Sequence, residues 1–331
     1  MTTTGSTIEM PSLHDAYRAH RRIRSMIWET PLRECADLAR KTGARSVHMK
    51  LECLQHTGAF KVRGAANKIL GLGEADRRRG VATFSTGNHG KAVAFVAGQS
   101  GIPAVVCLSE HVAASRAEAI HALGAELSVK GRSQDEAEAN YRRLVDERGL
   151  VPVVPFDDPA VIAGQGTVAL EILGSLPDTD TLLIPLSGGG LLAGIAMVAK
   201  SINPRIEVVG VSLARSPAML KSLEAGAPLQ IEERDSVADS LLGGVGLENH
   251  YTLPLVKRFV DRHLVIDETP IKNAMAFLFD RHRLVVEGAA AVGVGVLLHR
   301  MLDVAGRRVV TVLSGSTVDS AAYLRILQET L

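Results

Sequence analysis

Short β-branched segments alternate with amphipathic helical segments along most of the chain, and this alternation constrains the fold most strongly. Strands joined by helical crossovers run parallel, because a parallel connection needs a dozen or more residues. The sequence therefore predicts an α/β fold of mostly parallel sheets covered by helices, as one large sheet or two smaller ones. The predicted strands are 47–52, 81–84, 104–108, 126–129, 151–154, 181–186, 207–212 and 308–313, and the predicted helices are 61–72, 90–99, 114–123, 134–147, 160–173 and 191–202.

The charge balance argues against a dedicated nucleic-acid-binding protein. Lys and Arg number 37 against 36 Asp and Glu, so the formal net charge is +1, whereas neutralising phosphates needs a basic surplus. The most apolar stretches, 182–199 and 284–298, are interrupted by Ser187 with three glycines and by Glu287. Neither stretch is expected to cross a membrane.

The cysteines and the first residues predict a cytoplasmic protein. An odd number of cysteines without CxxC spacing suits a reducing compartment and argues against disulfides or a zinc site. The first residues lack the basic and apolar regions of a signal peptide. The three cysteines are Cys35, Cys53 and Cys107.

A glycine-rich turn follows the predicted strand 181–186 and opens the next helix. In the segment Ser187-Gly188-Gly189-Gly190-Leu191, successive backbone N–H groups can point at one anion beside the positive end of a helix. The spacing is neither GxGxxG nor GxxxxGK(S/T), so a dinucleotide or P-loop nucleotide fits poorly. A phosphate cradle and a turn needed only for strand–helix packing both remain open.

A second polar segment, Ser85-Thr86-Gly87-Asn88-His89, follows the predicted strand 81–84. Its hydroxyls, amide and imidazole at a helix N-terminus suit a carboxylate or a polar ring substituent. Ser, Thr and Asn also cap helices without any ligand, and a histidine in this position can be structural.

Lys61 is a candidate nucleophile at the start of the predicted helix 61–72. Burial among Ala59, Phe60 and Val62 and the positive end of the helix would disfavour its ammonium form, as an amine that forms a Schiff base requires. A solvated surface lysine is the alternative. Ser314 adds a hydroxyl at the end of the strand 308–313. A reactive amine, a phosphate cradle and polar strand ends together indicate pyridoxal 5'-phosphate.

The sequence contains six motifs in this order: KLECLQHTGAFKVRGA (50–65), STGNHG (85–90), IAGQGT (162–167), SGGGL (187–191), EGAA (287–290) and LSG (313–315). Together they resemble the threonine dehydratase/serine racemase family of fold-type II pyridoxal-phosphate enzymes. Three finer segments, 155–159, 185–190 and 238–244, look most like the hydroxyectoine utilisation dehydratases. The resemblance covers residues 13 to 327.

The resemblance implies a tryptophan synthase β-like fold of two three-layer domains with mostly parallel sheets. Residues 80–154 would form the small substrate-gating domain, and residues 1–79 with 155–331 the large cofactor-binding domain. It also implies a homodimer. The stretch 212–218, where the family places carboxylates for a divalent cation, contains no acid, so no metal is expected.

The same resemblance assigns roles to single residues. Lys61 would hold the cofactor covalently and act as base at Cα, and Thr86 stands where serine racemases carry a second base. Asn88 would contact the ring hydroxyl. The other implied contacts are Phe60 against the ring, Ser314 at the pyridine nitrogen, Ser187, Gly188, Gly189, Gly190 and Leu191 at the phosphate, and Ser85, Thr86 and His89 at the substrate carboxylate.

The implied reaction is β-elimination of water from a β-hydroxy amino acid, which releases a keto acid and ammonia and fits hydroxyectoine catabolism. Alternatives in the same fold are a serine/threonine deaminase, a hydroxyaspartate dehydratase or racemase, and a β-replacement enzyme of the cysteine-synthase type. A non-catalytic phosphate- or nucleotide-binding protein is the alternative from a different class.

Overall fold

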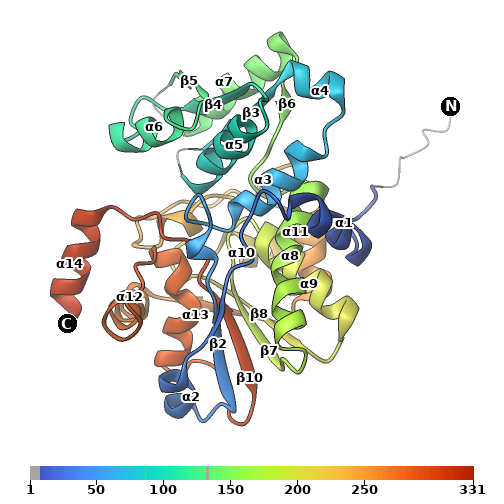
Figure 1. Cartoon of the computed structure of the whole chain (residues 1–331). Helices are drawn as coiled ribbons and strands as arrows, with labels where there is room; N and C mark the ends of the chain where they lie inside the picture. The colour runs from blue at the N-terminus through green and yellow to red at the C-terminus, as the bar shows by residue number, and fades with distance from the viewer. Residues whose placement is uncertain (1–7, 86, 132–133) are drawn as a thin grey trace.

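The chain folds around two separate sheets, so the second of the two predicted arrangements is correct (Figure 1). The structure is a computed structural model that describes residues 8–85, 87–131 and 134–331. The large sheet has the order β1-β2-β10-β7-β8-β9 and is parallel except for the β1–β2 pair. Its strands are β1 (Leu32–Glu34), β2 (Ser46–Lys50), β7 (Thr181–Pro185), β8 (Glu207–Leu213), β9 (Arg262–Ile266) and β10 (Arg308–Val312).

The small sheet has the order β5-β4-β3-β6 and is parallel throughout. In Figure 1 it lies above the large sheet, and its strands come from one continuous part of the chain. They are β3 (Val81–Phe84), β4 (Ala104–Leu108), β5 (Glu126–Val129) and β6 (Val151–Pro152).

Helices cover both faces of the large sheet. One buried apolar cluster joins the sheet to α8 and α9, and another joins it to α12 and α13. Both α9 and α13 are buried along most of their length, as expected for helices that are apolar on all sides. The helices are α1 (Leu13–Ile23), α2 (Ala36–Thr42), η1 (Glu52–Leu54), α3 (Lys61–Leu70), α4 (Glu74–Arg79), α5 (Asn88–Gln99), α6 (Ala114–His121), α7 (Gln134–Arg148), α8 (Pro159–Ser175), α9 (Gly190–Ile202), α10 (Ala218–Ala225), η2 (Asp239–Leu241), α11 (Thr252–Phe259), α12 (Glu268–His282), α13 (Gly288–Leu298) and α14 (Ser320–Thr330).

Helix α3 lies between the two halves of the molecule and packs against both α5 and α8. Its apolar side chains join the buried cluster that also contains α5 and β4. Helix α8 begins where the Asp158 side chain accepts hydrogen bonds from two backbone N–H groups and Pro159 takes the first position, a favoured helix start. No helix in the described ranges is long and apolar enough to span a membrane.

Candidate active site

Lys61 is the first residue of α3. Its Nζ donates a hydrogen bond to the Pro155 carbonyl oxygen at 2.8 Å and lies 5.2 Å from the centre of the Phe60 ring. Desolvation lowers the pKa of Lys61 to about 8, although the Glu287 carboxylate opposes the shift. About a tenth of the amine is then neutral at pH 7, against roughly one part in 3,000 for an ordinary lysine. The neutral form is the nucleophile.

The rate at which Lys61 reacts with an aldehyde is expected to rise with pH and level off above a midpoint near 8. The lowered pKa means that the neutral amine is reached at lower pH than in an ordinary lysine. Reductive methylation of the apoprotein with formaldehyde, followed by peptide mass spectrometry from pH 6 to pH 10, measures this rate. Lys68, which lies on the same helix in an ion pair with Asp158, gives the internal comparison. A midpoint above pH 10 for Lys61 would contradict the prediction.

The segment 187–191 turns from β7 into α9. Gly189 has a φ of +89°, which favours glycine. A Cβ at Gly188 would lie 2.5 Å from the Phe156 ring, and one at Gly190 would lie 3.0 Å from the Cα atom of Phe156. Phe156 therefore packs directly on the loop. Because the first N–H groups of a helix have no intrahelical partner, this turn suits an anion such as a phosphate.

Gly188→Ala is expected to weaken binding of pyridoxal 5'-phosphate about 10- to 100-fold, because overpacking of this kind costs ~1–3 kcal/mol. The new methyl group would displace the Phe156 ring from the loop. Fluorescence titration of the apoprotein measures the Kd. Gly174→Ala, near the end of α8, is the matched control, since a Cβ there meets nothing within 4 Å. Equal affinities in both variants would exclude the loop as the phosphate site.

The N-terminus of α5 carries two buried polar side chains, Asn88 and His89. Asn88 Nδ2 donates to both carboxylate oxygens of Glu287 at 3.0 Å, while its buried Oδ1 has no hydrogen-bond partner among the described residues. His89 Nε2 lies 2.9 Å from the Val153 carbonyl oxygen, and desolvation lowers the pKa of His89 to about 3. The neutral ring donates Nε2–H to that carbonyl, which makes the buried Nδ1 an acceptor.

The segment before α5 carries the predicted carboxylate contacts. The Ser85 hydroxyl oxygen accepts a hydrogen bond from the Gly87 backbone N–H at 3.3 Å. Thr86, predicted both as a carboxylate contact and as a second base, lies outside the described residues.

Ser314 is buried just after β10. Its carbonyl oxygen accepts a hydrogen bond from the Phe60 backbone N–H at 3.0 Å, and Gly315 forms an isolated antiparallel bridge with Ala59. The turn that carries Lys61 therefore lies against the end of this strand. The structure thus brings Lys61 close to Ser314, the residue predicted to contact the pyridine nitrogen, although the two are far apart in the sequence.

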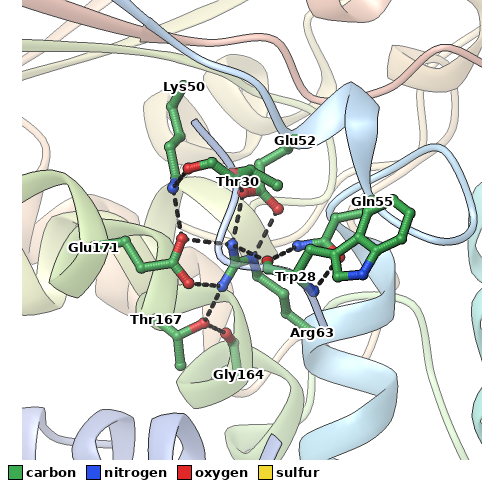
Figure 2. Close-up of polar contacts among 9 residues, drawn as sticks. All are labelled: Trp28, Thr30, Lys50, Glu52, Gln55, Arg63, Gly164, Thr167 and Glu171. Carbon is green, nitrogen blue, oxygen red and sulfur yellow. Dashed lines mark hydrogen bonds and ion pairs between the residues drawn. The ribbon is translucent and has the colours of Figure 1, made fainter. Parts of the chain in front are cut away.

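A buried network of four charges holds the first turn of α3 (Figure 2). The Arg63 guanidinium donates to the Glu52 carboxylate, with Nε 2.7 Å from Oε2, and to Glu171, with Nη1 2.5 Å from Oε1. Lys50 Nζ donates to the other Glu171 oxygen at 2.5 Å. All four side chains are at most 2% exposed. Two positive and two negative charges thus tie α3 to η1, α8 and β2.

No role was predicted from the sequence for three residues that contact the predicted site residues. Pro155 accepts the Lys61 hydrogen bond, Phe156 packs on the glycine loop, and Glu287 binds Asn88. Two of the segments compared with the family, 155–159 and 287–290, contain these residues. Their presence in those segments was a usable signal, but the contacts themselves depend on tertiary structure.

These residues fit a cofactor that combines an aldehyde, a phosphate and a polar aromatic ring. Lys61 supplies an amine that is partly neutral at pH 7, the segment 187–191 supplies an anion cradle, and Asn88 supplies an unpartnered amide oxygen. The fold and the site thereby define the class of α/β enzymes that hold a phosphorylated aldehyde through a lysine.

Comparison with known proteins gives the same class independently. Residues 23–315 match the model of the family described as pyridoxal-phosphate dependent enzymes, and the chain belongs to this family. It is 38% identical to the L-threonine ammonia-lyase of Thermotoga maritima over 322 residues, which is 97% of this chain and 79% of that protein.

Two solved structures share the fold. The structure of maize serine racemase has a TM-score of 0.90 and 30% identity, and the match covers 97% of this chain and 98% of the other. The processed form of threonine deaminase isoform 2 from Solanum lycopersicum has a TM-score of 0.88 and 27% identity, with 99% and 98% covered. The predicted fold class and the predicted cofactor, pyridoxal 5'-phosphate, are confirmed.

Proposed function

We propose that this chain is a pyridoxal-phosphate-dependent dehydratase that eliminates water from a β-hydroxy amino acid. The observation that carries the proposal is the position of the Lys61 amine, at the start of α3, 2.8 Å from the Pro155 carbonyl oxygen and beside the turn that contacts Ser314. Desolvation, which lowers the pKa of Lys61 to about 8, supports it. The 38% sequence identity to the L-threonine ammonia-lyase of Thermotoga maritima, over 97% of this chain, supports the same reaction. The products are a 2-keto acid and ammonia.

Each residue of the site has a separate role in the proposed reaction. The bound cofactor supplies an aromatic ring that takes up the electron pair of the Cα–H bond. Lys61 would hold the cofactor through Nζ and, with the substrate amine in its place, would accept the Cα proton on its neutral Nζ. The Cα proton and the β-hydroxyl together make up the one water eliminated, and the enamine that is released hydrolyses to the keto acid and ammonia. The segment 187–191 would hold the phosphate, and Ser314 would contact the ring nitrogen.

The substrate carboxylate is proposed to bind at the N-terminus of α5. Ser85 and Thr86 offer hydroxyls, and the helix offers its first backbone N–H groups. Because the neutral His89 ring already donates to Val153, His89 contributes its backbone N–H rather than a charged side chain. This arrangement supports binding of the substrate carboxylate by hydroxyls and backbone N–H groups.

The two sheets are proposed to mark two domains, with residues 80–154 as the small domain that gates substrate access. All four strands of the small sheet fall within this range. The large domain would then contain residues 1–79 and 155–331 and would form the contact of a homodimer in the cytoplasm. Light scattering coupled to size-exclusion chromatography tests the dimer, and a mass of one chain would exclude it.

A substrate panel tests the proposed reaction. The holoenzyme is incubated with L-threonine, L-serine, 3-hydroxyaspartate and the ring-opened hydroxyectoine-derived acid that carries a free 2-amino and a 3-hydroxyl group. Keto acid and ammonia are then measured, and the reaction is expected to release them in equal amounts. The hydroxyectoine-derived acid is included because segments 155–159, 185–190 and 238–244 favour it. No product from any β-hydroxy amino acid would overturn the proposal.

The same assay separates the alternatives. Interconversion of serine enantiomers measures racemisation, which the fold shared with maize serine racemase makes worth measuring. Incubation of O-acetylserine with sulfide measures β-replacement. Binding of a nucleotide by protein that takes up no pyridoxal 5'-phosphate would favour the non-catalytic alternative.

A further inference from the structure

Glu287 is a buried carboxylate that joins two sides of the proposed cofactor site. Beyond its contacts with Asn88, it accepts a hydrogen bond from the Thr317 backbone N–H at 3.1 Å. Asn88 is the proposed contact of the ring hydroxyl, and Thr317 lies in the loop that carries Ser314. The glycine at position 315 permits this arrangement, because a Cβ at Gly315 would lie 2.8 Å from the carboxylate.

The chemistry of a carboxylate fixes the orientation of the Asn88 amide. An ionised carboxylate only accepts hydrogen bonds, so it holds Asn88 by the Nδ2 donor and leaves Oδ1 as the unpartnered end. A protonated carboxyl group can donate instead. It can then pair with Oδ1, and the amide turns over to leave Nδ2 free.

We propose that Glu287 is a positioning residue that determines which end of the Asn88 amide meets the ring hydroxyl of the cofactor, and that protonation of Glu287 reverses the amide. This inference rests on the proposed function, because Asn88 has this role only if pyridoxal 5'-phosphate binds. With Glu287 ionised, Asn88 offers an acceptor to a ring O–H. With Glu287 protonated, Asn88 offers a donor that stabilises the ring oxygen as an anion.

The surroundings of Glu287 place its titration near neutral pH. Burial raises the pKa of Glu287 to about 7, and the charge of Asp239 on η2 adds to this while hydrogen bonds from its neighbours oppose it. The charged groups that face it from α3 and α5 are Lys61 and Lys91. Cys53 on η1 also feels its charge, but burial raises the pKa of that thiol to about 12, so the thiol stays neutral.

The first test compares holoenzyme spectra and apoprotein affinity across pH. The visible absorbance of the bound cofactor and its Kd are measured from pH 6 to pH 9 for the wild type, Glu287→Gln and Glu268→Gln. Glu268 is the matched control, because it also begins a helix and accepts hydrogen bonds from a loop, at Ser236 and Val237. The wild type and the control are expected to share a transition with a midpoint near pH 7.

In Glu287→Gln the transition near pH 7 is expected to disappear. The ratio of the Kd at pH 6 to the Kd at pH 9 is expected to differ from the wild-type ratio by about fivefold or more, as for loss of a hydrogen bond to a charged group. Glu287→Asp keeps a carboxylate and is expected to retain a transition. This second variant keeps the test decisive if the glutamine variant does not fold. A transition that persists unchanged in Glu287→Gln, or is lost equally in Glu268→Gln, would overturn the inference.

The second test asks whether Glu287 acts through Asn88. In an Asn88→Ala background, the Glu287→Gln substitution is expected to change the Kd less than about twofold, because the group it orients is gone. An equal effect in both backgrounds would contradict the inference. Failure of the proposed function is distinguishable, because in that case the wild type itself takes up no cofactor and forms no keto acid.

Discussion

Lys61→Ala is expected to lower turnover of a β-hydroxy amino acid by about 10⁴-fold or more, because loss of a general base alone costs 10²–10⁴-fold and the covalent anchor is lost as well. The variant should also lose the visible absorbance that survives dialysis in the wild type. Keto acid formation measures the rate. Intact mass after borohydride reduction measures the attached cofactor.

Two control variants make this result specific. Lys68→Ala removes another lysine of α3, one that pairs with Asp158, and is expected to keep the absorbance band and most of the activity. Lys61→Arg keeps a long cationic side chain but cannot supply a neutral amine, so it should be as inactive as the alanine variant. Activity of Lys61→Ala within tenfold of the wild type would refute the assignment.

The sequence predicted the central part of the fold because parallel strands buried on both faces form continuous apolar runs. Strands β4 and β7 are of this kind and are buried throughout. The edge strands β1 and β9 were not predicted, because β1 has only three residues, none of them buried, and β9 has a single buried residue and so lacks a continuous apolar run. The strand predicted at 151–154 pairs with β3 only over Val151–Pro152. Beyond it, the carbonyl oxygens of Val153 and Pro155 accept the hydrogen bonds from His89 and Lys61.

Some features of the site follow from the local sequence, whereas others depend on tertiary contacts. A glycine loop or a lysine at a helix start is a local pattern, and the predicted desolvation of Lys61 agrees with its lowered pKa. Helix α5 begins at Asn88 rather than at residue 90, so Asn88 and His89 belong to the helix. Glu287 contacts a residue 199 positions away, and no sequence pattern specifies such a pairing. The roles of the individual site residues remain predictions until the variants are measured.

Arg63→Met is expected to destabilise the fold by roughly 3–5 kcal/mol, because removing one partner leaves buried charges without compensation. Glu52 would lose its ion-pair partner, and Glu171 would keep only Lys50 (Figure 2). Urea unfolding followed by circular dichroism measures the change. Arg143→Ala, in the exposed pair with Glu147, is the control and should cost less than about 1 kcal/mol.

Removing one positive and one negative charge together tests whether the four residues act as one network. The double variant Lys50→Met/Glu171→Gln leaves Arg63 beside Glu52, a neutral pair whose Nε–Oε2 distance is 2.7 Å. Its loss of stability is expected to be smaller than the sum of the two single variants by ~1–3 kcal/mol, the range for residues that share partners. Because Arg63 lies one half-turn after Lys61 on α3, the double variant should also incorporate the cofactor better than either single variant. Strict additivity of the two substitutions would show that the charges contribute separately and that the first turn of α3 is held by its apolar contacts instead.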